Sequence, residues 1–205
     1  MIDPVGHLLA MGADRFAHVS GPLSEHLHRT QALLRQWGNR SAVCLAGLYH
    51  AVYGTEGIRG SLVGLDARAT IGAIIGDEAE QIAYVYGACA RSRFHPRIGT
   101  VDQLRFADRF TGTEYPITAS ALRDFCELTL ANELELATRS DAFRAEYRDE
   151  LSAFFDRMRG LVSDAGFEAY RRTLRPELPC AVAAGRRPAV DSGCPRAGGA
   201  SLDVA

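Results

Sequence analysis

The segment Ser24–Glu56, SEHLHRTQALLRQWGNRSAVCLAGLYHAVYGTE, decides the fold because it contains two consecutive helical patterns. Over residues 23–37, apolar and small side chains recur at steps of three and four, the period of an amphipathic helix. Residues 42–52 are apolar on nearly every face, which predicts a helix enclosed by other elements. His26 lies on the first helix and His50 on the second, so we expect both imidazoles to be buried.

Length and composition indicate one folded unit. The chain has 205 residues, of which 47% are hydrophobic and 23% charged, enough for one domain with a sizeable core. We place this domain at residues 1–175. Residues 176–205 are rich in Pro, Gly, Ala and Arg and have no aromatic residue or apolar period, which predicts a disordered C-terminal tail.

The charged residues exclude several classes of function. The formal net charge is -2, so we expect neither nucleic acid nor a membrane as a partner. All 23 basic residues are arginine, and without lysine the chain has neither Schiff-base chemistry nor a phosphate-binding P-loop.

The cysteines and the N-terminus predict a cytoplasmic protein. The five cysteines are odd in number and widely spaced, which is typical of a reducing compartment. The N-terminus has no basic-then-apolar signal pattern, and no apolar run approaches the roughly 20 residues that span a bilayer.

The rest of the chain predicts an all-α helical bundle. Residues 94–113 allow two interpretations, either a short β-hairpin or a long loop with a turn of helix at 102–107. A glycine-rich loop is expected over residues 53–65. Ser24, Asp66 and Asp77 are predicted helix caps. The further helices are expected at residues 5–16, 67–75, 78–91, 118–139, 141–161 and 168–174.

A set of motifs in residues 22–139 resembles the HD-domain superfamily of metal-dependent phosphohydrolases, in particular the hydrolase domains of the alarmone synthetase/hydrolase proteins. Glu25 to Thr30 resembles the family's first histidine motif, and Leu45 to His50 resembles its second. Ala131 to Leu134 falls where the family places its last aspartate. The resemblance implies an HD-like helical domain in which His26 and His50 bind a metal, and a hydrolase that acts on a small, phosphorylated metabolite.

Two of the family's four usual ligands are absent by residue type. The aspartate that follows the second histidine is Ala51 here, and the last aspartate position is Asn132. A dinuclear centre is therefore disfavoured, and we expect at most a single divalent transition metal, Fe, Mn, Zn, Co or Ni. The segment His50–Glu56 also resembles a bacterial family of unknown function, which implies a fold but no activity.

Two imidazoles leave most of the coordination shell open, so a third ligand is needed. Glu56, Glu80 and Glu133 are the candidates, and Glu56 and Glu133 are also the candidate catalytic bases. The candidate substrate-binding residues, including arginines suited to an anionic group, are Tyr53, Arg59 and Asn132, with Arg91 and Arg93 as alternatives to Arg59.

The residues leave two functions open. One is a hydrolase with a reduced metal site, and the other is a degenerate HD fold that binds a small-molecule ligand or forms a homodimer without catalysis. His26 and His50 could also be ordinary core histidines, each bonded to a hydroxyl or a carbonyl. The distance between the two imidazoles tests the metal-binding alternative, since ring nitrogens within about 4.5 Å of each other could share one metal and nitrogens much further apart could not.

Overall fold

The computed structural model describes residues 3–18, 21–56 and 60–175. The predicted tail at 176–205 and the candidate residue Arg59 lie outside the described residues. Within the described part the chain is predominantly helical. The predicted all-α fold class is therefore confirmed.

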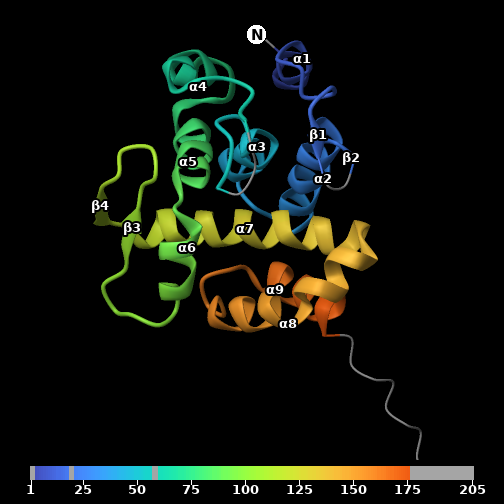
Figure 1. Ribbon diagram of the computed structural model, residues 1–205, viewed down its shortest axis with the longest axis vertical. Coiled ribbons are helices and arrows are strands. Elements are labelled where there is room, and N and C mark those ends of the chain that lie inside the picture. The colour runs from blue at the N-terminus through green and yellow to red at the C-terminus, as the bar shows by residue number, and fades with distance from the viewer. Residues whose placement is uncertain (1–2, 19–20, 57–59, 176–205) are drawn as a thin grey trace, which may run out of the picture.

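The long helix α7 (Ala119–Arg139) forms the middle of the molecule. The Thr118 side chain caps its first turn by accepting a hydrogen bond from the backbone N–H of Ala121. On one side lies a layer that contains α2 (Leu23–Gln36), α3 (Ser41–Tyr49) and α5 (Asp77–Ala88), and on the other lies a layer of α8 (Asp141–Arg157) and α9 (Asp164–Leu174) (Figure 1). Because α7 contacts both layers, most of its surface is buried.

The N-terminal part leads into α2. Helix α1 (Pro4–Ala10) begins after Asp3, whose carboxylate accepts two backbone hydrogen bonds. A short antiparallel pair, β1 (Ala17–His18) with β2 (Gly21–Pro22), follows. Helix α2 begins at Leu23, directly after Pro22. The prediction that Ser24 caps this helix is wrong, because the restricted φ of Pro22 sets the helix start and Ser24 lies inside the first turn.

Helices α2 and α3 pack closely at Gly47. A Cβ atom at this position would lie 2.4 Å from Cδ1 of Leu34 on α2, so only glycine allows this approach. Helix α3 ends at Tyr49, and His50 is its C-terminal cap residue. The predicted helix over 42–52 is thus correct in position but ends earlier, which puts His50 at a helix end.

The next helices meet at a glycine corner. Helix α4 (Arg68–Ile75) follows a 3-10 turn, η1 (Leu65–Ala67), so Asp66 lies within a turn and does not cap the helix by its side chain. Gly76 has φ of 88° and separates α4 from α5. Asp77 is the first residue of α5, where its negative charge interacts favourably with the positive end of the helix dipole.

The chain then turns through short elements. Helix α5 stops at Ala88, and α6 (Arg91–Phe94) and the 3-10 turn η2 (His95–Arg97) follow as separate pieces. Strands β3 (Arg105–Ala107) and β4 (Glu114–Pro116) form an antiparallel hairpin. The predicted hairpin is present, with its first strand inside residues 94–113 and its second strand directly after them, and the alternative helical turn at 102–107 is wrong.

Four tyrosines on or near the second histidine helix and on α5 lie in the core. Tyr49, Tyr53, Tyr84 and Tyr86 are all buried, as expected of side chains with an apolar body and a polar end. In the part of the chain that the structure describes, no helix is both long enough and apolar enough to cross a membrane.

Candidate functional site

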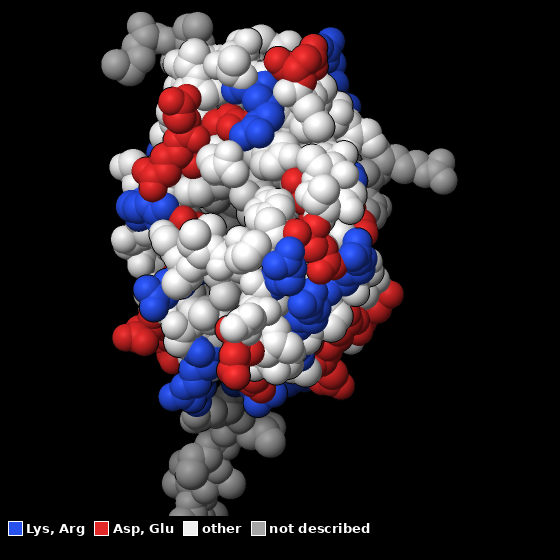
Figure 2. Space-filling model, turned by 90° about the vertical axis from the view of Figure 1, so that its left-hand side faces the viewer, with Lys and Arg blue, Asp and Glu red and all other residues white. Residues whose placement is uncertain are grey.

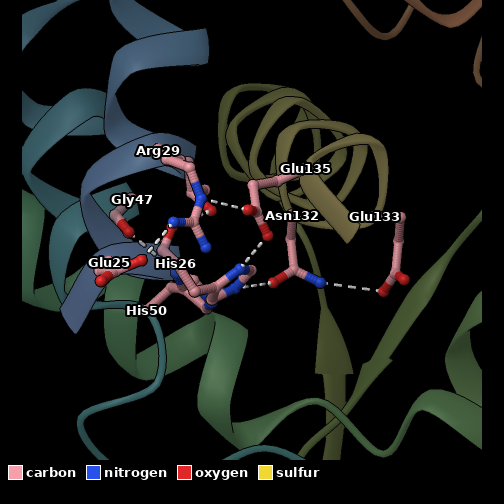
Figure 3. A network of polar contacts seen from close by, with 9 residues as sticks. Glu25, His26, Arg29, Gly47, His50, Asn132, Glu133 and Glu135 are labelled. Carbon is pink, nitrogen blue, oxygen red and sulfur yellow. Dashed lines mark hydrogen bonds and ion pairs between the residues drawn. The ribbon is translucent and has the colours of Figure 1, made fainter. Parts of the chain in front are cut away.

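His26 on α2 and His50 at the end of α3 face each other in the core. Their side chains belong to residues that are 0% and 2% exposed, and their Nε2 atoms lie 3.3 Å apart (Figure 3). This separation is within the 4.5 Å that a shared metal requires. The close packing of α2 and α3 at Gly47 brings the two rings together.

The protonation of His50 follows from its partners. Its Nδ1 lies 2.8 Å from the carbonyl oxygen of Gly47, and a carbonyl can only accept, so Nδ1 carries the proton. Burial, together with the nearby His26, lowers the pKa of His50 well below its ordinary value. The ring is therefore neutral, and the Nε2 lone pair points toward His26.

His26 is held from the other side by a carboxylate. Its Nδ1 donates to Glu135 on α7, and the same carboxylate accepts from Nε of Arg29 (Figure 3). Burial raises the pKa of Glu135, but the hydrogen bonds from His26 and Arg29 outweigh it and leave this pKa below its ordinary value. A charged carboxylate thus fixes the orientation of the His26 ring.

Asn132 adds a third polar atom at the same point. Its Oδ1 lies 3.0 Å from Nε2 of His26, while its Nδ2 donates to Glu133 at 3.0 Å. An amide oxygen and the His50 lone pair therefore both face Nε2 of His26. Because acceptors repel one another without a positive charge among them, a proton on His26 Nε2 or a bound cation would satisfy all three groups.

The spacing of the two imidazole nitrogens is compatible with two ligands of a single transition metal. Two nitrogens bonded at about 2.1 Å to one tetrahedral ion lie about 3.4 Å apart, close to the 3.3 Å between His26 and His50. Both rings also have the Nδ1 partners that orient metal-binding histidines, a carboxylate and a backbone carbonyl. The set lacks a carboxylate ligand: within the described ranges, no group of three or more His, Cys, Asp and Glu side chains could hold a metal.

Glu133 is the predicted acidic residue that lies next to this set. It accepts the Asn132 amide and lies 3.6 Å from a guanidinium nitrogen of Arg91. Burial raises its pKa, although Arg91 and Asn132 act in the opposite direction. Glu133 therefore has the environment of a group that can exchange a proton.

The other predicted site residues form their contacts elsewhere. The Glu56 carboxylate accepts the backbone N–H of Ser92 at 3.0 Å and so caps α6. The Tyr53 hydroxyl donates to Glu80 at 2.8 Å, and Arg68 binds the same carboxylate at 2.7 Å. The structure thus brings together His26, His50, Asn132 and Glu133, but not Tyr53, Glu56 or Glu80.

Two further residues belong to the site although sequence reasoning missed them. Glu135 lies three positions after Asn132, on the same face of α7, and this spacing could have revealed it. The His18 ring stacks on His26 with 4.2 Å between centroids and 22° between planes. Burial, followed by the proximity of His26, lowers the pKa of His18 to about 4. Nearly parallel rings do not aim their lone pairs at one point, so His18 covers His26 and does not complete a ligand set.

Two of the larger cavities lie beside or beyond this polar cluster. One, of about 330 Å³, is bordered by α5, the β3–β4 hairpin and the start of α7, and its rim carries Arg40 paired with Glu78 and Asp124. Figure 2 shows the corresponding side of the molecule, where charged side chains surround a mostly uncharged, hollowed area. The other, of about 390 Å³, is lined by residues of α6, η2, α7 and α8, among them Arg91, His95 and Glu133.

Part of the chain matches the sequence model of a protein family whose function is unknown. The sequence pattern of a domain of unknown function, DUF6817, matches residues 7–91, less than half of the chain but a stretch that includes both facing histidines. No curated protein and no solved structure matches the chain. The resemblance to the HD-domain superfamily stays a prediction.

Proposed function

We propose that this chain is a divergent metal-dependent hydrolase that acts on a small, phosphorylated metabolite. One divalent transition metal would be held by Nε2 of His26, Nε2 of His50 and Oδ1 of Asn132. The observation that supports this most is that Nε2 of His50 and Oδ1 of Asn132 lie 3.3 Å and 3.0 Å from Nε2 of His26, with both Nδ1 atoms already bonded to acceptors. Such an ion supplies Lewis-acid chemistry.

The residues around this set have distinct roles in the proposal. Glu135 and the Gly47 carbonyl orient the two imidazoles. Glu133, whose pKa is raised by burial, accepts or donates a proton. Arg91 binds the phosphate group, because a guanidinium pairs well with an oxyanion.

One observation favours the alternative, a non-catalytic ligand-binding domain. His26, His50 and Asn132 are only 0%, 2% and 6% exposed, so a substrate has little direct access to them in this conformation. In that case the cation is a proton on His26, and the polar cluster serves to hold α2, α3 and α7 together.

Metal analysis separates the two functions. The protein is purified without oxygen, unfolded in urea and refolded with Fe, Mn, Zn, Co or Ni, so that the enclosed site can take up the ion while the chain folds, and its bound metal is measured after gel filtration. We expect about one equivalent of metal in the wild type and little in His26→Gln or His50→Gln. His28→Gln is the matched control, since His28 is on the same helix but bonds to the carbonyl of Ser24. No bound metal in the wild type with any of the five ions would overturn the proposal.

Asn132→Asp tests the same site by a gain of binding. A carboxylate is a stronger ligand than an amide oxygen and has the same size, so we expect metal affinity to rise on the order of tenfold or more. Without a metal site, added metal leaves the stability of this variant unchanged. Hydrolysis of 4-nitrophenyl phosphate by protein refolded with metal, absent from protein refolded with a chelator, distinguishes a hydrolase from a protein that only binds metal.

The cysteines support the proposed cytoplasmic location. The three that lie in the described part, Cys44, Cys89 and Cys126, are buried and free. Free buried cysteines are typical of proteins that work in a reducing compartment.

A further inference from the structure

Arg91 carries a largely buried charge whose ion pair is long. Its side chain is 23% exposed, and its charge partners among the described residues include Glu133 and Tyr86. The nearby carboxylate of Glu133 is 3.6 Å away, too far for a direct hydrogen bond, and the ring of Tyr86 lies 5.1 Å below the guanidinium. Five N–H donors with little access to water favour an oxyanion beside them. Arg91 lines the cavity of about 390 Å³ between α6, α7 and α8.

Two more groups in the wall of this cavity have unused capacity for hydrogen bonds. Nε2 of His95 is buried and has no partner in the described part of the chain. Arg157 donates to the backbone carbonyls of Ile98, Ala153 and His95, which leaves two of its five N–H groups. Burial, together with Arg91 and Arg157, lowers the pKa of His95 to about 3. The positive charges of Arg91 and Arg157 therefore lie near a neutral His95 ring at one end of the cavity.

The remaining walls carry the carboxylates of Glu133 and Glu150 and several flat, apolar side chains. The rings of Phe143 and Tyr147 lie 4.7 Å apart, and His95 stacks on Phe154 with 4.7 Å between centroids. A volume of about 390 Å³ is in the range that holds small ligands. Aromatic walls of this kind pack well against an aromatic or otherwise planar ligand.

We propose that this cavity binds a small organic oxyanion with a flat apolar body. The oxyanion binds Arg91 and Arg157, and the body packs between Phe143, Tyr147 and Phe154. A carboxylate and a phosphate monoester share this chemistry. The inference rests on the proposed function in one respect: since Glu133 lines the cavity and bonds Asn132, this ligand class is the substrate class of that site. Binding itself requires no metal.

The test is calorimetric titration of the full chain, kept metal-free with a chelator. The probes are 1-naphthyl phosphate, 1-naphthoate, inorganic phosphate and the neutral 1-naphthalenemethanol. We expect at least one naphthyl anion to bind tenfold or more tightly than the neutral alcohol and than inorganic phosphate, roughly the effect of one charge-assisted hydrogen bond. The tighter of the two anions identifies phosphate or carboxylate as the natural group. If neither anion binds, or if the alcohol binds equally well, the proposal is wrong.

Arg157→Gln locates the binding and has a matched control. This substitution should weaken binding of the naphthyl anion about tenfold or more, whereas Arg148→Gln should not. Arg148 lies on the same helix and also donates to a backbone carbonyl, that of Leu174, outside this cavity. Equal effects of the two substitutions would contradict the proposal. A wild type that holds metal but binds no naphthyl anion refutes the cavity alone, and one that binds the anion but no metal refutes the proposed metal site alone.

Discussion

His26 differs from an ordinary core histidine because both of its ring nitrogens face specific polar atoms. On the Nδ1 side is the Glu135 carboxylate, and on the Nε2 side are His50 and Asn132. His50 has only a backbone carbonyl on its Nδ1. The two imidazoles are thus not equivalent, because a carboxylate orients the His26 ring and a backbone carbonyl orients the His50 ring.

Glu135→Gln tests this difference. The glutamine keeps the shape of the side chain but replaces the charged carboxylate that accepts the hydrogen bond from Nδ1 of His26 with a neutral amide. If the proposed metal site exists, we expect metal affinity to fall about 10- to 100-fold, measured by competition with a chelator. Glu25→Gln is the control, since Glu25 pairs with the same Arg29 at 2.9 Å but at the surface. Equal affinities in the two variants would contradict a role for Glu135.

At the scale of single residues, the sequence predicted the centre of the site better than its surroundings. The two histidines were predicted because they lie on apolar helical patterns, and Asn132 because it falls where the HD-domain superfamily, which the motifs resemble, has a ligand. Tyr53 and Glu56 follow His50 closely in sequence, but the chain leaves helix α3 at Tyr49. Beyond a helix end the period no longer fixes the direction of a side chain, so their contacts with Glu80 and Ser92 could not be predicted.

At the scale of elements, the separation of the two imidazoles depends on how closely α2 and α3 pack. Gly47→Ala would place a Cβ atom 2.4 Å from Cδ1 of Leu34 and 3.6 Å from Cα of Gln31. Leu34 is fully buried, so its methyl group has little room to move. We expect the free energy of unfolding in urea to fall by about 1–3 kcal/mol and metal affinity to fall with it.

The Leu34→Ala background identifies the contact responsible for that loss. Removing the Leu34 side chain removes the overlap, so Gly47→Ala should cost less there than in the wild type. The same cost in both backgrounds would show that the substitution acts through another contact. Urea unfolding of the four proteins of this cycle measures the difference.

The sequence predicted the starts of some helices better than those of others. Helices α7 and α8 begin directly after Thr118 and Ser140, whose hydroxyl groups cap them, and both starts were expected from local residues. Ser24 has the same residue type as Ser140 but lies inside α2 and is 8% exposed. Caps can be recognised only when the preceding residue does not already fix the helix start, as Pro22 does here.

At the scale of the whole molecule, stability should depend on pH through His95. Burial, with Arg91 and Arg157, lowers its pKa from 6.5 to about 3 in the folded protein. Below pH 6.5 the unfolded chain therefore binds a proton that the folded protein does not. The free energy of unfolding should then fall by up to about 1.4 kcal/mol per pH unit as the pH drops from about 6 to about 4.

His95→Phe removes this titration and keeps an aromatic ring beside Phe154. The unfolding free energy of the variant, measured in urea at several pH values, should fall less steeply with decreasing pH than that of the wild type. Parallel curves for the two proteins would mean that other groups cause the pH dependence. The difference in slope, not the stability at one pH, is the informative quantity.

The arrangement of the two layers could not be read from the sequence. On α7, Asn132 and Glu135 face the two histidines, whereas Glu133 lines the cavity toward α8. The period of α7 predicts that neighbouring residues face different sides, but it does not say which helix covers each side. That depends on how α8 and α9 fold back, and their sequences carry only the signal of an apolar face.

The near-complete enclosure of His26, His50 and Asn132 has a consequence for timing. A metal held there could not exchange with the surroundings by simple diffusion, since α2, α3 and α7 would first have to separate locally. The ion would be acquired while the chain folds and would be released only through rare opening events. Its identity in the mature protein would then reflect which metals the cell supplied during synthesis, and not their later concentrations.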